Sequence, residues 1–295
     1  MNDFFNEAIW EKAWKDDIYT RVNKMKSAGI DAAHAFDHKA SSFNEQAFNE
    51  EGRQRTKRIM NWLEGQGVKF KDTSILDIGA ASGGFSVPFA ERGASVTSVE
   101  PCLPLAELLV ENITGLTNGK VEVVSEPFED IDVQAKGWRK AFDLVFVSMC
   151  PVIVDWESVE KVLSCAQQFC YISLSAGSID HSLVNEVWPL VTDQPFDTEH
   201  SEMAYLLHLL YIKGYSYESL VTREMKTTEV SRKTALQEVM TWLGMYGLPA
   251  DDRNREIVAS YLERTYPSDK VGIRQGGRFG KVLIRLQDQN MYTRE

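Results

Sequence analysis

The stretch SILDIGAASGGFS, residues 74–86, constrains the fold more than any other part of this sequence. An apolar run ends at Ile78, a glycine-rich turn follows, and the pattern then favours a helix. Further apolar runs (ASVTSVEP, KVEVVSEP, FDLVFVSM and FCYISLSA) alternate with stretches of helical periodicity. This alternation predicts βαβ units, and therefore an α/β protein with a parallel sheet covered by helices on both faces.

Helical patterns flank the alternating region on both sides. The N-terminal part predicts a helical extension over residues 1–70 that folds over the site as a lid, and the main domain is expected over 71–295. Within that domain, two amphipathic helices predict a helical insertion at about 228–270. The final apolar run, GKVLIRLQ, reads as the last strand, and RQGGRFG before it reads as a turn.

Composition and charge narrow the function. The 295 residues carry 32 Lys and Arg against 43 Asp and Glu, a net charge of −11, which disfavours a nucleic-acid partner. The four cysteines form no CxxC pair and no metal-binding pattern with histidine, so no metal site is expected. No apolar run is long enough to cross a membrane, and the first residues carry no signal-peptide pattern. We therefore expect a soluble, cytoplasmic protein without a membrane partner.

The glycine turn is a poor match to a dinucleotide site. The G-x-G-x-x-G frame reads Gly79-x-Ala81-x-x-Gly84, which places a Cβ where a pyrophosphate would approach the backbone most closely. Asp77, two residues before Gly79, would repel a phosphate but favour a ligand with a cationic group nearby. The residues therefore disfavour an NAD-dependent oxidoreductase and favour a ligand with an ammonium group and a ribose.

A second carboxylate extends this interpretation. ASVTSVEP ends at Glu100, 21 residues after Gly79, the spacing expected of an acid that binds ribose hydroxyls. That spacing alone suits NAD equally well. Together with Asp77 and Gly83, however, ILDIGAASG and VEP resemble the first motifs of class I S-adenosyl-L-methionine-dependent methyltransferases. The resemblance covers about residues 70–175, and Ala81 replaces the middle glycine of the family pattern.

The resemblance implies a Rossmann-like, doubly wound sheet of seven strands with the last one antiparallel, and an enzyme that releases S-adenosyl-L-homocysteine. It places Asp77 and Gly79 beside the methionine moiety and both ribose hydroxyls on Glu100. An acid of the loop SEPFED would take the adenine amino group, although a solvated acidic loop is the plain alternative. The complete set of implied cofactor-binding residues is Asp77, Gly79, Ala80, Ala81, Gly83, Glu100, Pro101, Cys102, Leu103, Glu126, Phe128 and Ser148.

The methyl acceptor is less defined by the sequence. The segment from Ser148 to Pro151 lacks the Asn/Asp-Pro-Pro-Tyr/Phe motif of adenine amino-methyltransferases. GAASGGFS resembles RNA 2′-O-methyltransferases, but Ser148 stands where that family has an aspartate, and FCYISLSAG lacks its lysine. Cys150 precedes Pro151, the reverse of the Pro-Cys order of cytosine C5 enzymes, so a buried thiol is the expected role.

No catalytic base stands out, and His34, His38 and Tyr19 are the weak candidates. The two histidines would share a helix face, but no third ligand supports a metal. The sequence therefore predicts an S-adenosylmethionine-dependent methyltransferase that acts on a small molecule or metabolite. The alternatives are an RNA 2′-O-methyltransferase and a non-catalytic, S-adenosylmethionine-binding scaffold of the same fold. The oligomeric state and the atom methylated stay open.

Overall fold

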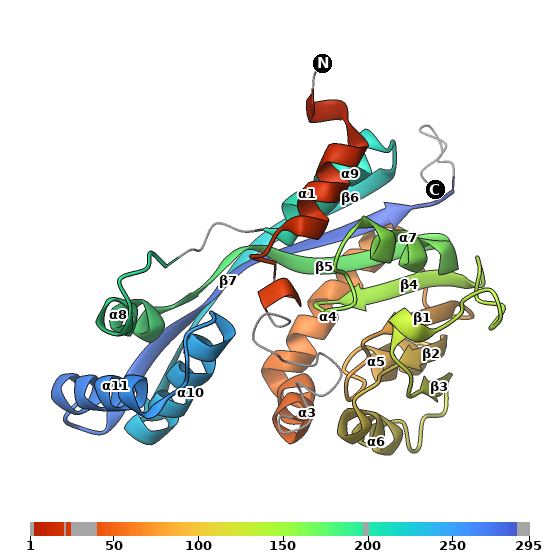
Figure 1. The fold of residues 1–295 in the computed structure, drawn as a ribbon. Helices are drawn as coiled ribbons and strands as arrows, with labels where there is room; N and C mark the ends of the chain where they lie inside the picture. The colour runs from red at the N-terminus through yellow and green to blue at the C-terminus, as the bar shows by residue number, and fades with distance from the viewer. Residues whose placement is uncertain (1–2, 21, 25–39, 197–200, 288–295) are drawn as a thin grey trace.

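The computed structural model describes residues 3–20, 22–24, 40–196 and 201–287, and a seven-stranded sheet forms the centre of this part of the chain (Figure 1). The strand order is β3-β2-β1-β4-β5-β7-β6. Strands β1 to β5 pair in parallel, and β7 runs antiparallel between β5 and β6. The prediction of the class I methyltransferase fold is therefore confirmed. The strands are β1 (Ser74–Ile78), β2 (Ser95–Val99), β3 (Lys120–Val124), β4 (Phe142–Ser148), β5 (Ala166–His181), β6 (Ser216–Ser231) and β7 (Lys270–Arg285).

The order reverses between β1 and β4, because the chain first adds β2 and β3 on one side and then returns. Ligands of open α/β sheets bind at such a point, beyond the carboxyl ends of the strands. Both strands are largely buried on their two faces, as the mainly apolar runs SILDI and FDLVFVS predict. A charged residue within such a strand is consequently exceptional, and Asp77 is one.

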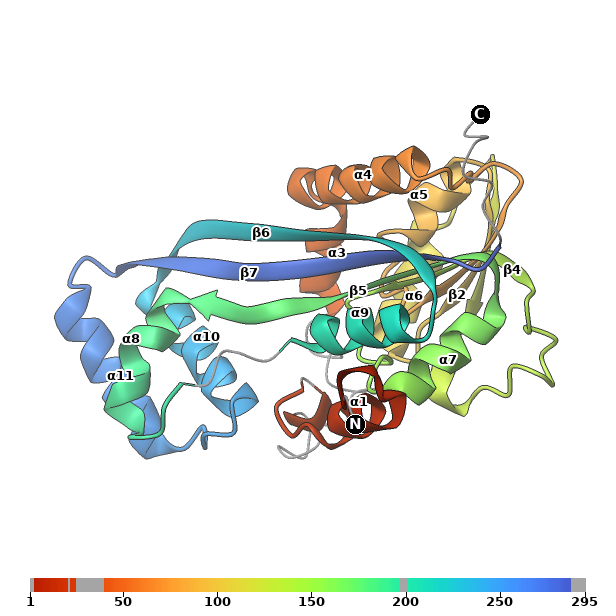
Figure 2. The same ribbon diagram turned by 90° about the horizontal axis from the view of Figure 1, so that it is seen from above.

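Helices cover both faces of the sheet (Figure 2). On one face, the side chains of Met60 and Leu63 pack with Phe89, Phe146 and Tyr171. The other face holds a larger core that includes Trp14, Trp156 and Leu206. Helices α4 and α5 supply the first layer, whereas α1, α7 and α9 supply the second. The helices of this part are α1 (Glu7–Asp16), α3 (Ala40–Phe48), α4 (Glu50–Gly65), α5 (Ser86–Glu91), α6 (Leu103–Asn112), α7 (Trp156–Cys165) and α9 (Glu202–Ile212), with short turns η1 (Asp3–Phe5) and η3 (Phe128–Asp130).

Three long strands carry a second cluster of helices at one end of the molecule (Figure 1). The pairing of β4 with β5 ends at Ser148 and Ser173, but β5, β6 and β7 continue to 16 residues each. We call the helices at their far end the distal lobe: α8 (Ser182–Val191), α10 (Arg232–Met245) and α11 (Asp252–Thr265). The lobe has its own buried core, formed by Leu183, Val184, Val187, Trp188, Ala235, Val239, Met240, Leu243, Val258, Leu262, Val271 and Ile273.

The sequence RQGGRFG is not the turn that we predicted, because it lies inside β7. Gly276 pairs with Met225 of β6 in a backbone conformation of φ +153°, and a Cβ there would overlap the backbone oxygen of Glu224. A Cβ on Gly280 would overlap the side chain of Met203 on α9. These glycines allow close packing within the sheet and against a helix, which a local sequence pattern cannot distinguish from a turn.

Candidate cofactor and acceptor site

Asp77 lies at the carboxyl end of β1 and is 3% exposed. Ser86 Oγ donates a hydrogen bond to Asp77 Oδ2 at 2.6 Å, and Ser98 Oγ donates to Ser86 Oγ at 2.8 Å. Burial raises the pKa of Asp77 to about 7; the Ser86 hydroxyl opposes this shift, and the nearby Glu100 adds to it. Burial thus moves the titration of the ligand-free carboxyl group toward neutral pH, and a cation beside it would favour the carboxylate.

Glu100 follows β2 and shares this end of the sheet. Its Oε2 accepts a hydrogen bond from the Ala81 N–H at 2.8 Å, and its Oε1 accepts one from the Cys102 N–H at 2.9 Å. Burial raises the pKa of Glu100, and the two backbone donors oppose that shift. Each carboxylate oxygen keeps a second lone pair. The two bonds thus orient Glu100 and leave it able to accept hydrogen bonds from a pair of hydroxyl groups.

The turn between β1 and α5 uses left-handed backbone at Gly79 (φ +74°), Ala81 (φ +49°) and Gly83 (φ +92°). Such a conformation is strained for Ala81, and its N–H is the group that binds Glu100. A Cβ on Gly83 would overlap Leu109 of α6. The turn is therefore packed closely against its surroundings, with the strained residue held by a buried carboxylate.

The N-terminal helices α3 and α4 lie against this turn. Thr56 Oγ1 donates to the backbone oxygen of Gly84 at 3.3 Å. Asn112 Nδ2 donates to Asn44 Oδ1 and to the Ser82 backbone oxygen, at 2.9 Å each. A small apolar cluster joins the start of α3 to the turn and to α6: Ala40, Phe43, Ala81, Cys102, Leu105 and Leu108. The N-terminal segment thus contributes walls beside the predicted cofactor residues.

The remaining predicted cofactor residues lie in two places. Ala80 and Cys102 are buried, Pro101 is half-buried and Leu103 is 62% exposed; all four border the carboxyl ends of β1 and β2. Glu126 lies beyond β3, where its exposed carboxylate forms an ion pair with Lys136 at 2.8 Å.

Phe128, beyond β3, is a core residue. Its ring is 3% exposed, packs with the larger core, and carries Lys161 Nζ at 5.1 Å from its centroid. Packing in the core therefore accounts for an apolar residue at position 128 without a ligand.

The carboxyl end of β4 lies at the same edge of the sheet as that of β1. Ser148 Oγ lies 3.2 Å from Ser173 Oγ of β5, and Ser173 Oγ also accepts a hydrogen bond from the Met149 N–H at 3.2 Å. Met149 adopts a left-handed φ of +54°. The chain then turns over a small hollow lined by Val22, Met149, Cys150, Pro151, Ile153, Leu174, Ser175 and Glu202.

Sequence reasoning missed several residues of this hollow. Ser175 follows the apolar core of a predicted strand, so its place at a strand end offered a signal. Val22 and Glu202 lie far away in the sequence, inside patterns that predict only helices. Glu202 is the residue that gives the hollow a carboxylate, and only the tertiary fold brings it there.

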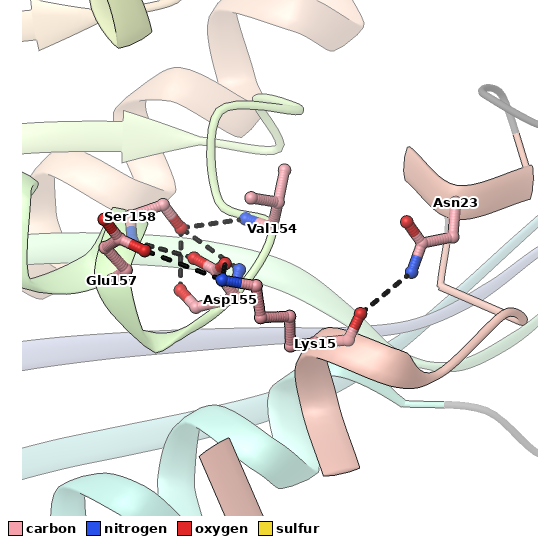
Figure 3. Close-up of polar contacts among 6 residues, drawn as sticks. All are labelled: Lys15, Asn23, Val154, Asp155, Glu157 and Ser158. Carbon is pink, nitrogen blue, oxygen red and sulfur yellow. Dashed lines mark hydrogen bonds and ion pairs between the residues drawn. The ribbon is translucent and has the colours of Figure 1, made fainter. Parts of the chain in front are cut away.

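Figure 3 shows the polar contacts between helix α1 and the start of α7. Lys15 Nζ lies 3.9 Å from Asp155 Oδ2 and 3.7 Å from Glu157 Oε2, at the start of α7. Asp155 and Ser158 form a capping box there, and Asn23 Nδ2 donates to the Lys15 backbone oxygen at 3.5 Å. The first turn of α7, which follows the loop after β4, is thus held to the N-terminal helix.

The structure gives no further support to Tyr19, His34 or His38 as the catalytic base. Tyr19 is 42% exposed, with Lys24 Nζ 5.8 Å from its ring centroid. His34 and His38 lie outside the described residues. Within the described residues, no group of three His, Cys, Asp or Glu side chains could hold a metal ion. The same residues include no helix that is both long and apolar enough to span a membrane.

A larger hollow, of about 570 Å³, opens at the opposite end of the sheet. Its lining includes Ser74, Ser95, Lys120 and Asp143, which lie at the amino ends of strands β1 to β4 or just inside them. Ligands of open α/β sheets bind at the carboxyl ends. This larger hollow therefore lies at the other end of the strands from Asp77 and Glu100.

Comparison with known sequences gives a partial match. No protein-family model matches the chain. A segment of 108 residues is 30% identical to protein arginine N-methyltransferase 1 of Oryza sativa subsp. indica, covering 34% of this chain and 28% of that protein. The protein of the same name from subsp. japonica matches to the same extent. The chain thus spans little more than a quarter of the length of these curated relatives.

Several solved structures resemble the chain at low identity. The plantazolicin methyltransferase BpumL, in complex with S-adenosylhomocysteine, is 13% identical with a TM-score of 0.48, over 94% of this chain and 99% of that one. Magnesium protoporphyrin IX methyltransferase from Synechocystis PCC 6803, with bound S-adenosylmethionine, is 14% identical with a TM-score of 0.41, over 75% and 90%. An S-adenosylmethionine-dependent methyltransferase from Methanosarcina mazei is 14% identical with a TM-score of 0.40, over 77% and 98%.

Proposed function

We propose that this protein is an S-adenosylmethionine-dependent methyltransferase that acts on a small-molecule acceptor. The observation that carries the proposal is the pair of buried carboxyl groups, Asp77 and Glu100, at the carboxyl ends of adjacent strands beside a glycine turn. S-adenosylmethionine presents an ammonium group, a ribose diol and a sulfonium-bound methyl group. A buried acid near the first and an oriented carboxylate for the second suit this ligand.

The same residues argue against a dinucleotide. Glu100 would suit the ribose of NAD equally, but the turn would have to accept a pyrophosphate beside Asp77. A second negative charge there would raise the pKa of a carboxyl group that is already near 7. The Cβ of Ala81 also stands at the middle-glycine position of the phosphate-binding frame. A ligand without phosphate avoids both costs.

The chain's own contribution to the reaction is chiefly to position the reactants. Methyl transfer from a sulfonium is an in-line displacement, which gains most from holding donor and acceptor in one geometry. Glu100 is oriented by two backbone N–H groups, and the turn after β4 is fixed by Ser173 and by packing against Gly79. Cys150, Leu174 and Glu202 would face the acceptor from the small hollow.

The surroundings of this hollow support a small acceptor. Helix α1 is fastened to the start of α7, Val22 lines the hollow, and α3 covers the glycine turn. Walls supplied by the N-terminal helices suit a metabolite better than an open nucleic-acid groove, but the hollow itself, at about 10 Å³, has to widen to admit one. Ser148 still lacks the carboxylate of RNA 2′-O-methyltransferases. The partial match to a protein arginine N-methyltransferase supports methyl transfer and makes a guanidinium group the second acceptor class to test.

Calorimetric titration with S-adenosylhomocysteine, with NADH as the control ligand, tests the cofactor assignment. We expect binding of the first and none of the second. Binding of NADH alone, or of neither ligand, would contradict it. Turnover of labelled S-adenosylmethionine with pooled small molecules then separates an enzyme from a binding scaffold, because a scaffold would bind the cofactor and transfer no methyl group to any pool.

A further inference from the structure

Strand β6 offers a long pairing edge. It is the last strand at one edge of the sheet, and it pairs with β7 from Ser216 to Ser231 without a register shift (Figure 2). The strand contains no proline, and much of its length is exposed. Natural edge strands are usually short, bulged or interrupted, because a regular edge presents unpaired N–H and C=O groups to another chain. Natural edges can also be protected by charged side chains, and β6 carries these.

The order of those charges makes them suitable for pairing with a second copy. Two equivalent antiparallel strands are related by a twofold axis, and their residue pairs alternate between two hydrogen-bonding types. If the axis passed between two residues, the two facing pairs on either side of it would be equivalent by symmetry and yet of different types. The axis must therefore pass through one residue, which lies opposite its own copy. A centre at Arg223, Glu224 or Lys226 would place like charges face to face, which is destabilising.

A centre at Met225 avoids every clash of this kind. Glu224 then lies opposite Lys226 of the second copy, and the same ion pair recurs on the other side of the axis. Within its own chain Glu224 accepts a hydrogen bond from Thr222 Oγ1 at 3.1 Å and lies 3.7 Å from Lys281 Nζ, so Lys226 would join an existing contact. Outward from the centre, Arg223 faces Thr227. The remaining facing pairs are Thr222 with Thr228, Val221 with Glu229, Leu220 with Val230 and Ser219 with Ser231.

A centre at Thr222 is the other long register in which no like charges face each other, since a centre at Val221 would set Glu218 opposite Glu224. It is less favourable than the Met225 centre. It would pair Glu218 with Lys226, but Glu218 already accepts hydrogen bonds from the Arg285 guanidinium, at 2.9 Å from both Nε and Nη2. It would also set both Leu220 and Val221 opposite charged residues, Glu224 and Arg223, whereas the Met225 centre does so for Val221 alone, opposite Glu229. The Met225 centre instead pairs Leu220, which is 37% exposed, with the apolar Val230. Cross-strand pairs of opposite charge, of two threonines and of apolar residues each stabilise a sheet.

We propose that β6 is a dimerisation edge, at which two copies of this chain pair antiparallel about Met225 and join their sheets. The pairing runs from Ser219 to Ser231, where α10 begins in each copy. It needs no ligand and does not depend on the proposed function. The interface is stabilised by backbone hydrogen bonds, two Glu224–Lys226 ion pairs and two Leu220–Val230 contacts.

Sedimentation equilibrium of the full chain tests the interface. We expect a dimer, weakened about tenfold or more by Lys226→Glu, because each such change replaces two attractive pairs by two repulsive ones. The charge-swapped double variant Glu224→Lys/Lys226→Glu should restore dimerisation in part, because the lysine introduced at position 224 would also lie near Lys281, whose Nζ is 3.7 Å from Glu224 Oε1 in the wild type. Lys120→Glu is the matched control, since it makes the same charge change on β3, at the opposite edge of the sheet. A monomer, or a dimer indifferent to Lys226→Glu, would overturn the proposal.

A disulfide tests the register. Residues that lie opposite each other on antiparallel strands have Cα atoms about 4.5–5.5 Å apart, which a disulfide can span. Met225→Cys should therefore form a covalent dimer under mild oxidation. Thr227→Cys should not, because its copy would lie about 13 Å along the partner strand. The Met225 centre would be refuted if the protein were dimeric and neither variant crosslinked, or if Thr227→Cys crosslinked in preference to Met225→Cys. The wild-type protein, oxidised in the same way, measures any background crosslinking through Cys150.

Discussion

Gly79 and Cys150 bring the turn after β1 into direct contact with the turn after β4. A Cβ on Gly79 would lie 2.9 Å from Cys150 Cβ and would overlap Cys150 Sγ. The first turn carries the predicted cofactor residues, and the second lines the hollow proposed for the acceptor. The glycine is therefore required by space as well as by its φ of +74°, and this contact sets the separation of the two halves of the site.

Gly79→Ala should lower the free energy of unfolding by about 2–4 kcal/mol, through left-handed backbone strain and overpacking. Chemical denaturation of the ligand-free protein measures this. Cys150→Gly removes both clashing atoms, so the double variant should recover part of the loss, beyond the sum of the single effects. Gly244→Ala in α10, which meets nothing within 4 Å, is the control and should be neutral or stabilising. Equal effects of the two alanines would contradict the contact.

Asp77→Asn should stabilise the ligand-free protein at neutral and higher pH. The folded-state pKa of Asp77 lies at about 7, above its ordinary value of 3.8, so the folded state binds more protons between these values and loses stability as pH rises through them. The variant lacks this loss. The free energy of unfolding of the variant should therefore exceed that of the wild type by nothing near pH 4 and by several kcal/mol above pH 7. Urea titrations at a series of pH values measure this difference. A constant difference across that series would show that Asp77 is ionised throughout.

The affinity for S-adenosylhomocysteine should rise by about tenfold between pH 6 and pH 8, because the ligand's ammonium group favours the ionised form of a group whose pKa is near 7. Calorimetry in buffers of different ionisation enthalpy should also detect a proton released on binding near pH 6.5. Asp77→Asn should bind more weakly and show neither effect. A wild-type affinity that does not change with pH would place the cation elsewhere.

Glu100→Gln should abolish measurable cofactor binding and also destabilise the protein by about 1–3 kcal/mol. The amide's NH₂ group would face one of the two backbone donors, Ala81 N–H or Cys102 N–H, which then lacks an acceptor. Calorimetry and denaturation measure the two effects separately. Glu126→Gln is the comparison. It breaks an exposed ion pair with Lys136 and should leave stability nearly unchanged, while any loss of affinity would support contact with the adenine.

Trp14→Ala should destabilise the protein by about 3–5 kcal/mol, because this side chain is fully buried and belongs to the larger core of the sheet. Its ring also stacks on Tyr205 of α9, with centroids 5.9 Å apart. Phe5→Ala, which removes a ring that is 60% exposed in the same N-terminal segment, should change stability little. A small effect of Trp14→Ala in thermal unfolding would mean that α1 can leave the core without loss, as a freely detachable lid would.

The sequence alone predicted the sheet, and the place of Asp77 and Glu100 at its carboxyl edge, for a physical reason. Parallel strands are buried on both faces, so Ile75, Leu76 and Val145 appear in uninterrupted apolar runs. The positions of Asp77 and Glu100 follow from this, since Asp77 is the last but one residue of such a run, Glu100 follows another, and adjacent parallel strands end at one edge. The turn residues could be read locally because backbone conformation at Gly79 and Gly83 depends on residue type.

Only the tertiary structure decided the rest, because it depends on contacts between segments distant in the chain. Burial beside Glu100 sets the pKa of Asp77, and the same packing makes Phe128 part of the core. Gly276 and Gly280 resemble turn residues in the sequence, yet their missing side chains serve strand and helix packing. Glu202 reaches the hollow after β4 through the fold of α9. Local patterns record how a segment folds, whereas its neighbours in space determine what its side chains do.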